Sequence, residues 1–248
     1  MRLNKVSTLI ATAVLATLSA APALANQAGD IVVRAGLTKI NPSSEQSTIY
    51  ALNKTVDLGA GAITASTEDD SQLGLNFVYF VTDNLAIELL AATPFSHDIT
   101  VNTGAGAVNL GETKHLPPTL SALYYFNDAT AKFQPYIGLG INYTVFFEEK
   151  FNPALTGDSS PEIVKLGGED FGPAPINLTN LKLKNSWGLS AQVGADYKLN
   201  DQWLVNASAR YIDIDTTATF NAVNDEVTGQ VDVSIDPWVY TISFGYTF

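Results

Sequence analysis

Residues 186–197 read Ser-Trp-Gly-Leu-Ser-Ala-Gln-Val-Gly-Ala-Asp-Tyr, and they carry the clearest repeating pattern of the chain. Every second residue from Trp187 to Tyr197 is apolar, and the residues between them are small or polar. A period of two is typical of a β-strand that has one apolar face and one polar face. The segment therefore predicts a strand whose two sides meet different surroundings.

The same alternation recurs along the chain and predicts eight strands, at residues 30–38, 72–81, 85–95, 116–126, 135–147, 186–197, 203–215 and 238–248. Short connections (82–84, 127–132, 200–202) alternate with long ones (41–71, 97–115, 148–180, 216–230). Outer-membrane barrels have short periplasmic turns and long extracellular loops. We therefore predict an all-β fold: an eight-stranded antiparallel transmembrane β-barrel with both ends of the chain on the short-turn side.

A water-soluble barrel or sandwich also alternates, so the period alone does not say which face is outside. Trp187 and Tyr197 lie ten residues apart on one face, as do Trp238 and Phe248. At ~3.3 Å per residue and a tilt near 40°, ten residues cover about 25 Å, the height of the apolar band between two aromatic girdles. This spacing favours lipid around the apolar faces.

Composition excludes several classes of protein. The 248 residues include no Cys, which rules out disulfides, Cys-ligated metals and thiol catalysis. With 25 Asp and Glu against 13 Lys and Arg, and no basic run, the chain has no charge pattern for nucleic acid. The most apolar mature stretch, residues 85–95, contains Glu88 and Pro94 and is about half the length of a membrane-spanning helix.

Residues 1–25 resemble a cleaved signal peptide. Arg2 and Lys5 precede an apolar stretch at 6–18, and Ala23-Leu24-Ala25 is typical of a cleavage site. We expect a mature barrel domain of residues 26–248, with 11 Lys and Arg against 25 Asp and Glu once Arg2 and Lys5 are removed. An uncleaved N-terminal membrane anchor is the alternative.

Five blocks carry a family resemblance: 88–95 (ELLAATPF), 114–120 (KHLPPTL), 135–144 (PYIGLGINYT), 213–218 (DIDTTA) and 236–239 (DPWV). In order and sequence they resemble the outer membrane protein W (OmpW) family over essentially the whole mature chain. The terminal Phe248, with Tyr246 and Phe244, is similar to the signal by which the outer-membrane assembly machinery recognises such barrels. Residues 153–177 depart from the family pattern as an enlarged loop.

The resemblance implies a narrow, partly hydrophobic barrel that passes small apolar molecules and releases them sideways into the bilayer. Eight strands leave room for side chains or one small ligand, which disfavours diffusion of hydrophilic solutes. We predict no cofactor and no enzyme activity. The alternative is a structural or receptor barrel whose loops bind lipopolysaccharide, phage or bacteriocin without transport.

Inward-facing residues follow from the strand register. Val78, Phe80, Leu90, Leu123 and Val239 give an apolar part of the lining, and Arg34, Glu88, Asp196 and Arg210 give a charged part. Charges in so narrow a space must pair, so we interpret them as structural plugs, with selectivity as the alternative. The resemblance places Leu90 at a constriction, but Arg210 stands where the family has an aromatic partner.

Three prolines suggest a lateral exit. Pro94 ends one predicted strand, and Pro117 and Pro118 begin its neighbour in the hairpin, so all three are expected near the outer rim. Each proline lacks a backbone donor for the ladder. As the resemblance suggests, we hypothesise that the two strands part there, although the prolines could simply end the strands above the membrane.

His97 and His115 are the candidates for a metal or acid–base site. Both flank the second long connection, where Asp98 or Glu112 could complete a cluster. Solvated histidines at the rim are the simpler interpretation, and we predict no metal site. The acidic segments 68–70 and 169–170 would either repel anionic lipopolysaccharide or bind it through divalent cations.

Overall fold

The computed structural model describes residues 26–42, 49–51, 64–66, 70–103, 106–166 and 169–248, so the predicted signal peptide lies outside the described residues. Within these residues no helix is long and apolar enough to cross a membrane. The elements are β1 (Ile31–Asn41), β2 (Ile49–Ala51), β3 (Thr64–Ser66), β4 (Asp70–Phe80), β5 (Leu85–Ala92), β6 (Phe95–Thr103), β7 (Gly106–Leu116), β8 (Thr119–Tyr125), β9 (Phe133–Phe151), the 3₁₀ turn η1 (Pro153–Leu155), β10 (Glu162–Leu166), β11 (Glu169–Pro175), β12 (Thr179–Leu183), β13 (Ser186–Lys198), β14 (Trp203–Ile212), β15 (Asp215–Ala222), β16 (Val227–Ser234) and β17 (Trp238–Thr247).

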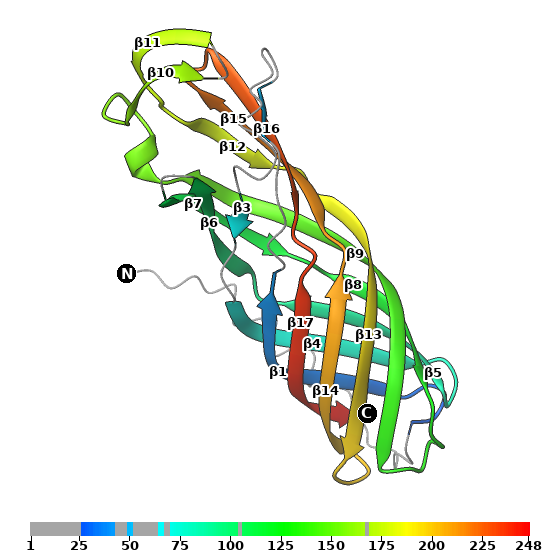
Figure 1. The fold of residues 1–248 in the computed structure, drawn as a ribbon. Helices are drawn as coiled ribbons and strands as arrows, with labels where there is room; N and C mark the ends of the chain where they lie inside the picture. The colour runs from blue at the N-terminus through cyan, green and yellow to red at the C-terminus, as the bar shows by residue number, and fades with distance from the viewer. Residues whose placement is uncertain (1–25, 43–48, 52–63, 67–69, 104–105, 167–168) are drawn as a thin grey trace, which may run out of the picture.

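Eight of these strands close into an antiparallel barrel (Figure 1). Their order around the ring is β1, β4, β5, β8, β9, β13, β14 and β17, and β17 pairs with β1 to close it. The pairing of β13 with β9 is continuous over twelve residues, from Ser186↔Thr144 to Tyr197↔Phe133. The predicted fold class is confirmed.

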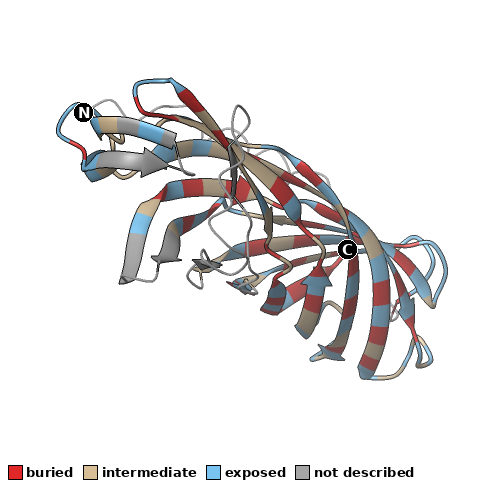
Figure 2. Ribbon diagram, turned by 45° about the horizontal axis from the view of Figure 1, so that its top comes forward, coloured by how far each residue is buried: buried red, intermediate tan, exposed pale blue. Residues whose placement is uncertain are grey.

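The apolar faces point away from the barrel interior. Buried and exposed residues alternate along the barrel strands (Figure 2). Trp187, Leu189 and Phe244 are 71%, 68% and 62% exposed, whereas a water-soluble barrel would bury them. An exposed apolar belt of this extent is stable only in lipid, because water would contact all of it.

The short connections lie together at one end of the barrel. They join β4 to β5, β8 to β9 and β13 to β14, and β1 begins where β17 ends, with Phe248 N donating to Ile31 O. By the turn lengths of outer-membrane barrels this end is periplasmic.

At the opposite end of the barrel, the structure has strands where the sequence predicted long loops. Strand structure continues there: β6 pairs with β7, β7 pairs with β9, and β12, β15, β16 and β2 form a separate sheet. Residues 153–177 hold η1 and the β10–β11 hairpin. An extracellular apolar cluster supports this region, built from Leu178, Ala222, Val223 and Val227. Local alternation is weak in these segments, which is why the sequence predicted loops.

Three of the predicted strands run further than the strands of the structure. The strand predicted at 85–95 ends at Ala92, and the one predicted at 116–126 begins at Thr119, because prolines interrupt both. The strand predicted at 203–215 divides into β14 and β15, since Asp213 and Ile214 form a bend between them.

The lumen holds two separate apolar clusters. The lower apolar cluster, near the short turns, comprises Val32, Val78, Phe80, Ala86, Leu123, Tyr125, Tyr136 and Leu204. The upper apolar cluster, toward the extracellular end, comprises Ile40, Phe95, Phe146, Ile212, Ile214, Ile235 and Val239. On β1 the buried residues run from Val32 through Arg34 to Ile40, so a charged layer lies between the two clusters.

Candidate functional site

Four charged side chains form the layer that crosses the lumen. Arg34 Nη1 donates to Glu88 Oε2 at 3.1 Å, and Arg34 Nη2 donates to Asp196 Oδ2 at 2.5 Å. Arg210 Nη2 donates to Glu88 Oε1. The side chains are at most 3% exposed, and the two positive charges balance the two negative ones. The sequence expectation that these charges pair is confirmed.

Neutral side chains complete the bonding of the two carboxylates. Asn76 Nδ2 and Gln192 Nε2 each donate to Glu88 at 2.9 Å. The hydroxyl of Tyr125 lies 3.2 Å from Asp196 Oδ2 and accepts from Arg34 at 2.7 Å. A buried charge is costly unless it is both paired and hydrogen-bonded, and both carboxylates meet that condition.

Aromatic rings fill the lumen below the charged layer. The rings of Phe80 and Tyr125 lie 5.1 Å apart, and those of Tyr125 and Tyr136 lie 5.0 Å apart. The Arg34 guanidinium carbon lies 5.6 Å from the centre of the Tyr136 ring, within reach of a cation–π contact. These rings and the lower apolar cluster therefore place packed side chains across the periplasmic half of the lumen.

All of the predicted lining residues point inward. Val78, Phe80, Glu88, Leu90, Leu123, Arg34, Asp196, Arg210 and Val239 are each at most 3% exposed. Arg210 also donates to Gln192 at 2.8 Å, so its guanidinium is held by polar partners. A role of these residues in passage or selectivity stays a prediction.

Sequence reasoning missed the polar partners of the charged layer: Asn76, Tyr125, Tyr136, Gln192 and Asn206. Asn206 Nδ2 donates to Asp196 at 2.8 Å and to the Tyr136 hydroxyl at 3.0 Å. Each of these residues occupies an inward-facing position of its strand. The alternation of inward and outward positions is the signal by which the sequence could have shown them. Which inward residues share one height depends on strand stagger, which no single strand encodes.

The backbone ladder is interrupted at the three prolines. β5 pairs with β8 up to Leu90↔Thr119, and pairing resumes above at Phe95↔His115 between β6 and β7. Residues 91–94 and 116–118 form no ladder pairs with each other, and we call this interruption the ladder gap. The prolines thus lie in one gap, as predicted, and Pro94 and Pro118 are exposed while Pro117 is buried.

Outer neighbours stabilise both edges of the ladder gap. Ala91 and Ala92 remain paired with Leu75 and Gly74 of β4. On the other edge, Tyr143 N donates to Pro118 O at 3.1 Å. Each edge therefore belongs to a separate, hydrogen-bonded part of the wall.

The two histidines are buried, so the expectation that they are solvated residues of the rim is wrong. His97 and His115 are 3% and 1% exposed, and their rings stack with centroids 4.9 Å apart. Phe95 and Phe146 pack on His115 at 5.6 and 5.8 Å. Burial, followed by the neighbouring His97, lowers the pKa of His115 to about 3, so its imidazole is neutral near pH 7.

The suggested acid partners of the histidines lie on the wrong face. Asp98 and Glu112 are cross-strand partners of each other, and both are exposed, while the histidine rings are buried. Side chains of odd and even positions leave a strand on opposite sides, so these carboxylates do not meet the imidazoles. The suggested cluster of these four residues is wrong.

The acidic segments predicted to meet lipopolysaccharide are only partly described. Residues 68 and 69 lie outside the described residues. Asp70 accepts from Gln72 Nε2 and from Ser96 N, each at 3.0 Å, and Asp170 accepts from Gly172 N at 3.0 Å. The bonds from Gln72 and Gly172 are local, and the bond from Ser96 joins Asp70 to β6.

Comparison with known proteins identifies the family of this barrel. The sequence model of the OmpW family matches residues 27–248. The chain belongs to the OmpW family. Its location is accordingly the outer membrane, and the resemblance noted in the sequence is confirmed.

Individual relatives of this OmpW-family barrel match over nearly their whole length. Outer membrane protein W of Vibrio cholerae serotype O1 is 45% identical over 243 residues, which is 97% of this chain and 99% of that protein. The crystal structure of OprG from Pseudomonas aeruginosa has a TM-score of 0.76 at 36% identity and covers 91% of this chain and 99% of its own. A more distant relative, dibenzothiophene metabolism operon protein PahQ of Pseudomonas aeruginosa, is 26% identical over 188 residues, 75% of each chain.

Proposed function

We propose that this barrel is a passive channel that takes up small hydrophobic molecules and releases them sideways into the outer membrane. The observation that carries the proposal is the ladder gap at Pro94, Pro117 and Pro118, which lies above a lumen filled with side chains. A molecule that enters from outside has a blocked path below it and an unpaired stretch of wall beside it.

The contents of the lumen favour an apolar solute. From the extracellular side the first interior layer is the upper apolar cluster, and the charged layer lies beneath it. Passage along the axis would separate Arg34 and Arg210 from Glu88, which leaves charges buried and unpaired. An apolar solute is stabilised when it leaves water for the upper apolar cluster, and it stays in apolar surroundings when it moves on into lipid.

The prolines make an opening in the wall less costly. In lipid each unpaired backbone N–H or C=O costs several kcal/mol, so a barrel normally has no gaps. Proline carries no N–H, and three of the seven residues in the ladder gap are prolines. Strands can therefore part here with fewer lost donors than elsewhere in the ring.

The name of one relative supports the proposed class of solute. PahQ belongs by name to a dibenzothiophene metabolism operon, and dibenzothiophene is a small hydrophobic molecule. For this chain we propose only the class of small hydrophobic molecules as the solute, without naming a particular compound.

Uptake of naphthalene by cells that express this chain in place of their own OmpW-family protein tests the proposal. We expect Pro94→Val to lower the uptake rate several-fold toward that of cells without the barrel, because valine restores a ladder donor. Pro135→Val is the matched control, since Pro135 lies in β9 at the periplasmic end and outside the gap. Both variants are first checked for folding by heat-modifiable migration on gels.

Two results would overturn parts of the proposal. Wild-type uptake by folded Pro94→Val would reject the lateral exit. Equal uptake with and without the barrel would reject transport altogether.

The second candidate is a receptor or structural barrel that binds lipopolysaccharide, phage or bacteriocin. The ordered sheet of β12, β15, β16 and β2, with the extracellular apolar cluster beside it, favours this alternative because it offers a firm surface beyond the barrel. Loss of phage or bacteriocin sensitivity in the deletion strain, with unchanged naphthalene uptake, would support it.

A further inference from the structure

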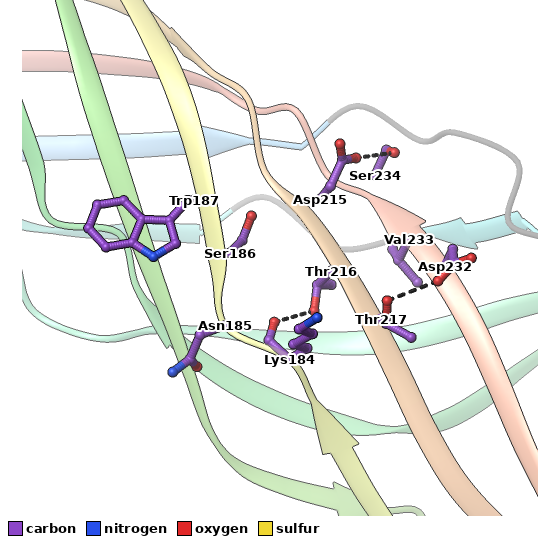
Figure 3. A pocket seen from close by; sticks show the side chains of 10 residues that line it. All are labelled: Lys184, Asn185, Ser186, Trp187, Asp215, Thr216, Thr217, Asp232, Val233 and Ser234. Carbon is purple, nitrogen blue, oxygen red and sulfur yellow. Dashed lines mark hydrogen bonds between the residues drawn. The ribbon is translucent and has the colours of Figure 1, made fainter.

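A polar groove of about 270 Å³ lies beside the extracellular rim, between the top of β13 and strands β15 and β16 (Figure 3). β13 pairs with β14 only as far as Ser190↔Ile212, and β12 pairs with β15 only as far as Leu183↔Ala218. Between these ladders, Asp213 N donates to Leu189 O and Lys184 N donates to Thr217 O. The groove is therefore a second interruption in strand pairing, and eight of its ten lining residues are polar.

Ser186 gives the groove an unused polar group. The residue is 3% exposed, and its hydroxyl has no hydrogen-bond partner. In Figure 3 this hydroxyl points into the groove, toward the side where Asp215 lies. Buried hydroxyls in proteins are nearly always bonded, so an unbonded one on a groove wall indicates a place for a ligand oxygen.

Three carboxylates converge at the Asp215 side of the groove. Asp213, Asp215 and Asp236 each offer an oxygen, and these oxygens all lie within 4.8 Å of one another. Neither Asp213 nor Asp215 forms an ion pair with a Lys or Arg of the described residues. Like charges this close repel, and a cation between them would remove that repulsion.

The fold places these carboxylates on the outer side of the wall. Ile214 is fully buried in the upper apolar cluster, whereas Asp215 is exposed and Asp213 is half-buried. Asp236 has a left-handed backbone, with φ of 38°, and accepts from Ile214 N at 2.9 Å. The bend between β14 and β15 and the bend between β16 and β17 therefore meet at one point.

We propose that Asp213, Asp215 and Asp236 hold a hard divalent cation, such as Ca²⁺, that binds a phosphate-bearing lipid headgroup in the groove. Ca²⁺ takes six to eight oxygen ligands, so three carboxylates leave positions open. Trp187 is 71% exposed at the foot of the groove, and interfacial tryptophans mark the headgroup level of a membrane. The exposed Lys184 and the Ser186 hydroxyl are then the groove's partners for phosphate and headgroup oxygens.

Calorimetric titration of the mature barrel in maltoside micelles with CaCl₂ tests the cation site. We expect one saturable site, weakened at least tenfold by Asp215→Asn. Asp232→Asn is the matched control: Asp232 lines the same groove and accepts from the Thr217 hydroxyl at 2.9 Å, but it lies outside the cluster. This control should change the affinity less than twofold.

Absence of saturable Ca²⁺ binding, or equal affinities for wild type and folded Asp215→Asn, would overturn the cation site. Similar losses in Asp215→Asn and Asp232→Asn would also overturn it, because a diffuse acidic surface would then explain the binding. Heat-modifiable migration on gels verifies that each variant is folded.

The headgroup is tested by the ratio of Ca²⁺ affinities in nanodiscs with and without phosphatidylglycerol in phosphatidylcholine. We expect the anionic lipid to tighten Ca²⁺ binding more for wild type than for Lys184→Gln, since both proteins meet the same surface potential. An equal ratio for wild type and Lys184→Gln would reject binding of the lipid headgroup in the groove. Tightening by inorganic phosphate in micelles to the same degree would show that the groove selects free phosphate and would reject a lipid ligand.

Discussion

Arg34 on β1 and Asp196 on β13 meet across the lumen, with 2.5 Å between Nη2 and Oδ2. These strands share no ladder, because β17 and β14 separate them around the ring. The contact therefore joins two sides of the barrel through its interior. It also sets the height of the charged layer that divides the two apolar clusters.

Removal of the central acid should destabilise the barrel strongly. Glu88→Ala leaves Arg210 without its buried carboxylate, and such a loss costs about 3–5 kcal/mol. Urea unfolding in lipid vesicles, followed by tryptophan fluorescence, measures the change. Glu112→Ala is the control, because its pair with Lys150 is exposed and 3.6 Å long, and unfolding should barely change.

A double variant separates lost pairing from lost packing at the same site. Glu88→Leu combined with Arg210→Leu removes both charges and should recover part of the stability lost in Glu88→Ala. Stability below that of the single variant would mean that the polar layer itself, including Gln192 and Asn76, holds the barrel together.

A charge on the outer belt should be costly only at membrane depth. Leu139 is 71% exposed near the middle of β9, and Leu139→Arg is expected to destabilise the barrel by about 2–4 kcal/mol in vesicles. Ser159→Arg, at an exposed position in the extracellular region, should have little effect. Equal effects of the two variants would contradict a lipid-facing belt.

Closure of the ring should depend on Gly36. A Cβ at this position would lie 2.1 Å from Ile242 O and 2.4 Å from Ser243 Cα, which are backbone atoms of the closing strand β17. Gly36→Ala should therefore force β1 and β17 apart and lower the folded fraction after refolding. Ala35→Val, with its side chain on the exposed face, should fold as wild type in the same gel assay. Normal folding of Gly36→Ala would show that the seam is more tolerant than its spacing suggests.

His115 should stay neutral in the folded barrel well below pH 6. Burial is the largest cause of its lowered pKa, and His97 adds to it while Asp70 opposes both. Because the unfolded chain binds a proton near pH 6.5 and the folded one near pH 3, stability should fall as the pH drops from 6.5 toward 3. The contribution is at most ~1.4 kcal/mol per pH unit.

The difference between wild type and His115→Phe isolates this effect from other titrating groups, since phenylalanine can keep the stack with Phe95 and Phe146. The variant should lose part of the pH dependence of unfolding between pH 6.5 and 4. Imidazole resonances of His115 should not shift between pH 7 and 5. A titration midpoint near pH 6.5 in the folded barrel would refute the buried placement.

Local pattern was enough to predict the barrel strands and their two faces. The alternation from Trp187 to Tyr197 belongs to one strand, and a strand shows its faces through its own residues. The alternation of short and long connections added the ring and its orientation. The prolines at 94, 117 and 118 were expected near one another because they border the same hairpin.

Position along each strand groups the residues into two faces, and the spacing of the aromatic residues on one of them assigned that face to lipid and the other to the lumen. Only the assembled barrel brings Arg34, Glu88, Asp196 and Arg210 into one layer, and only there do the carboxylates of Asp213, Asp215 and Asp236 come together. The burial of His97 on β6 and His115 on β7 also follows from the assembled structure. These groupings join different strands, and the heights at which strands meet are set by the stagger of the closed ring, which no single segment of the chain encodes.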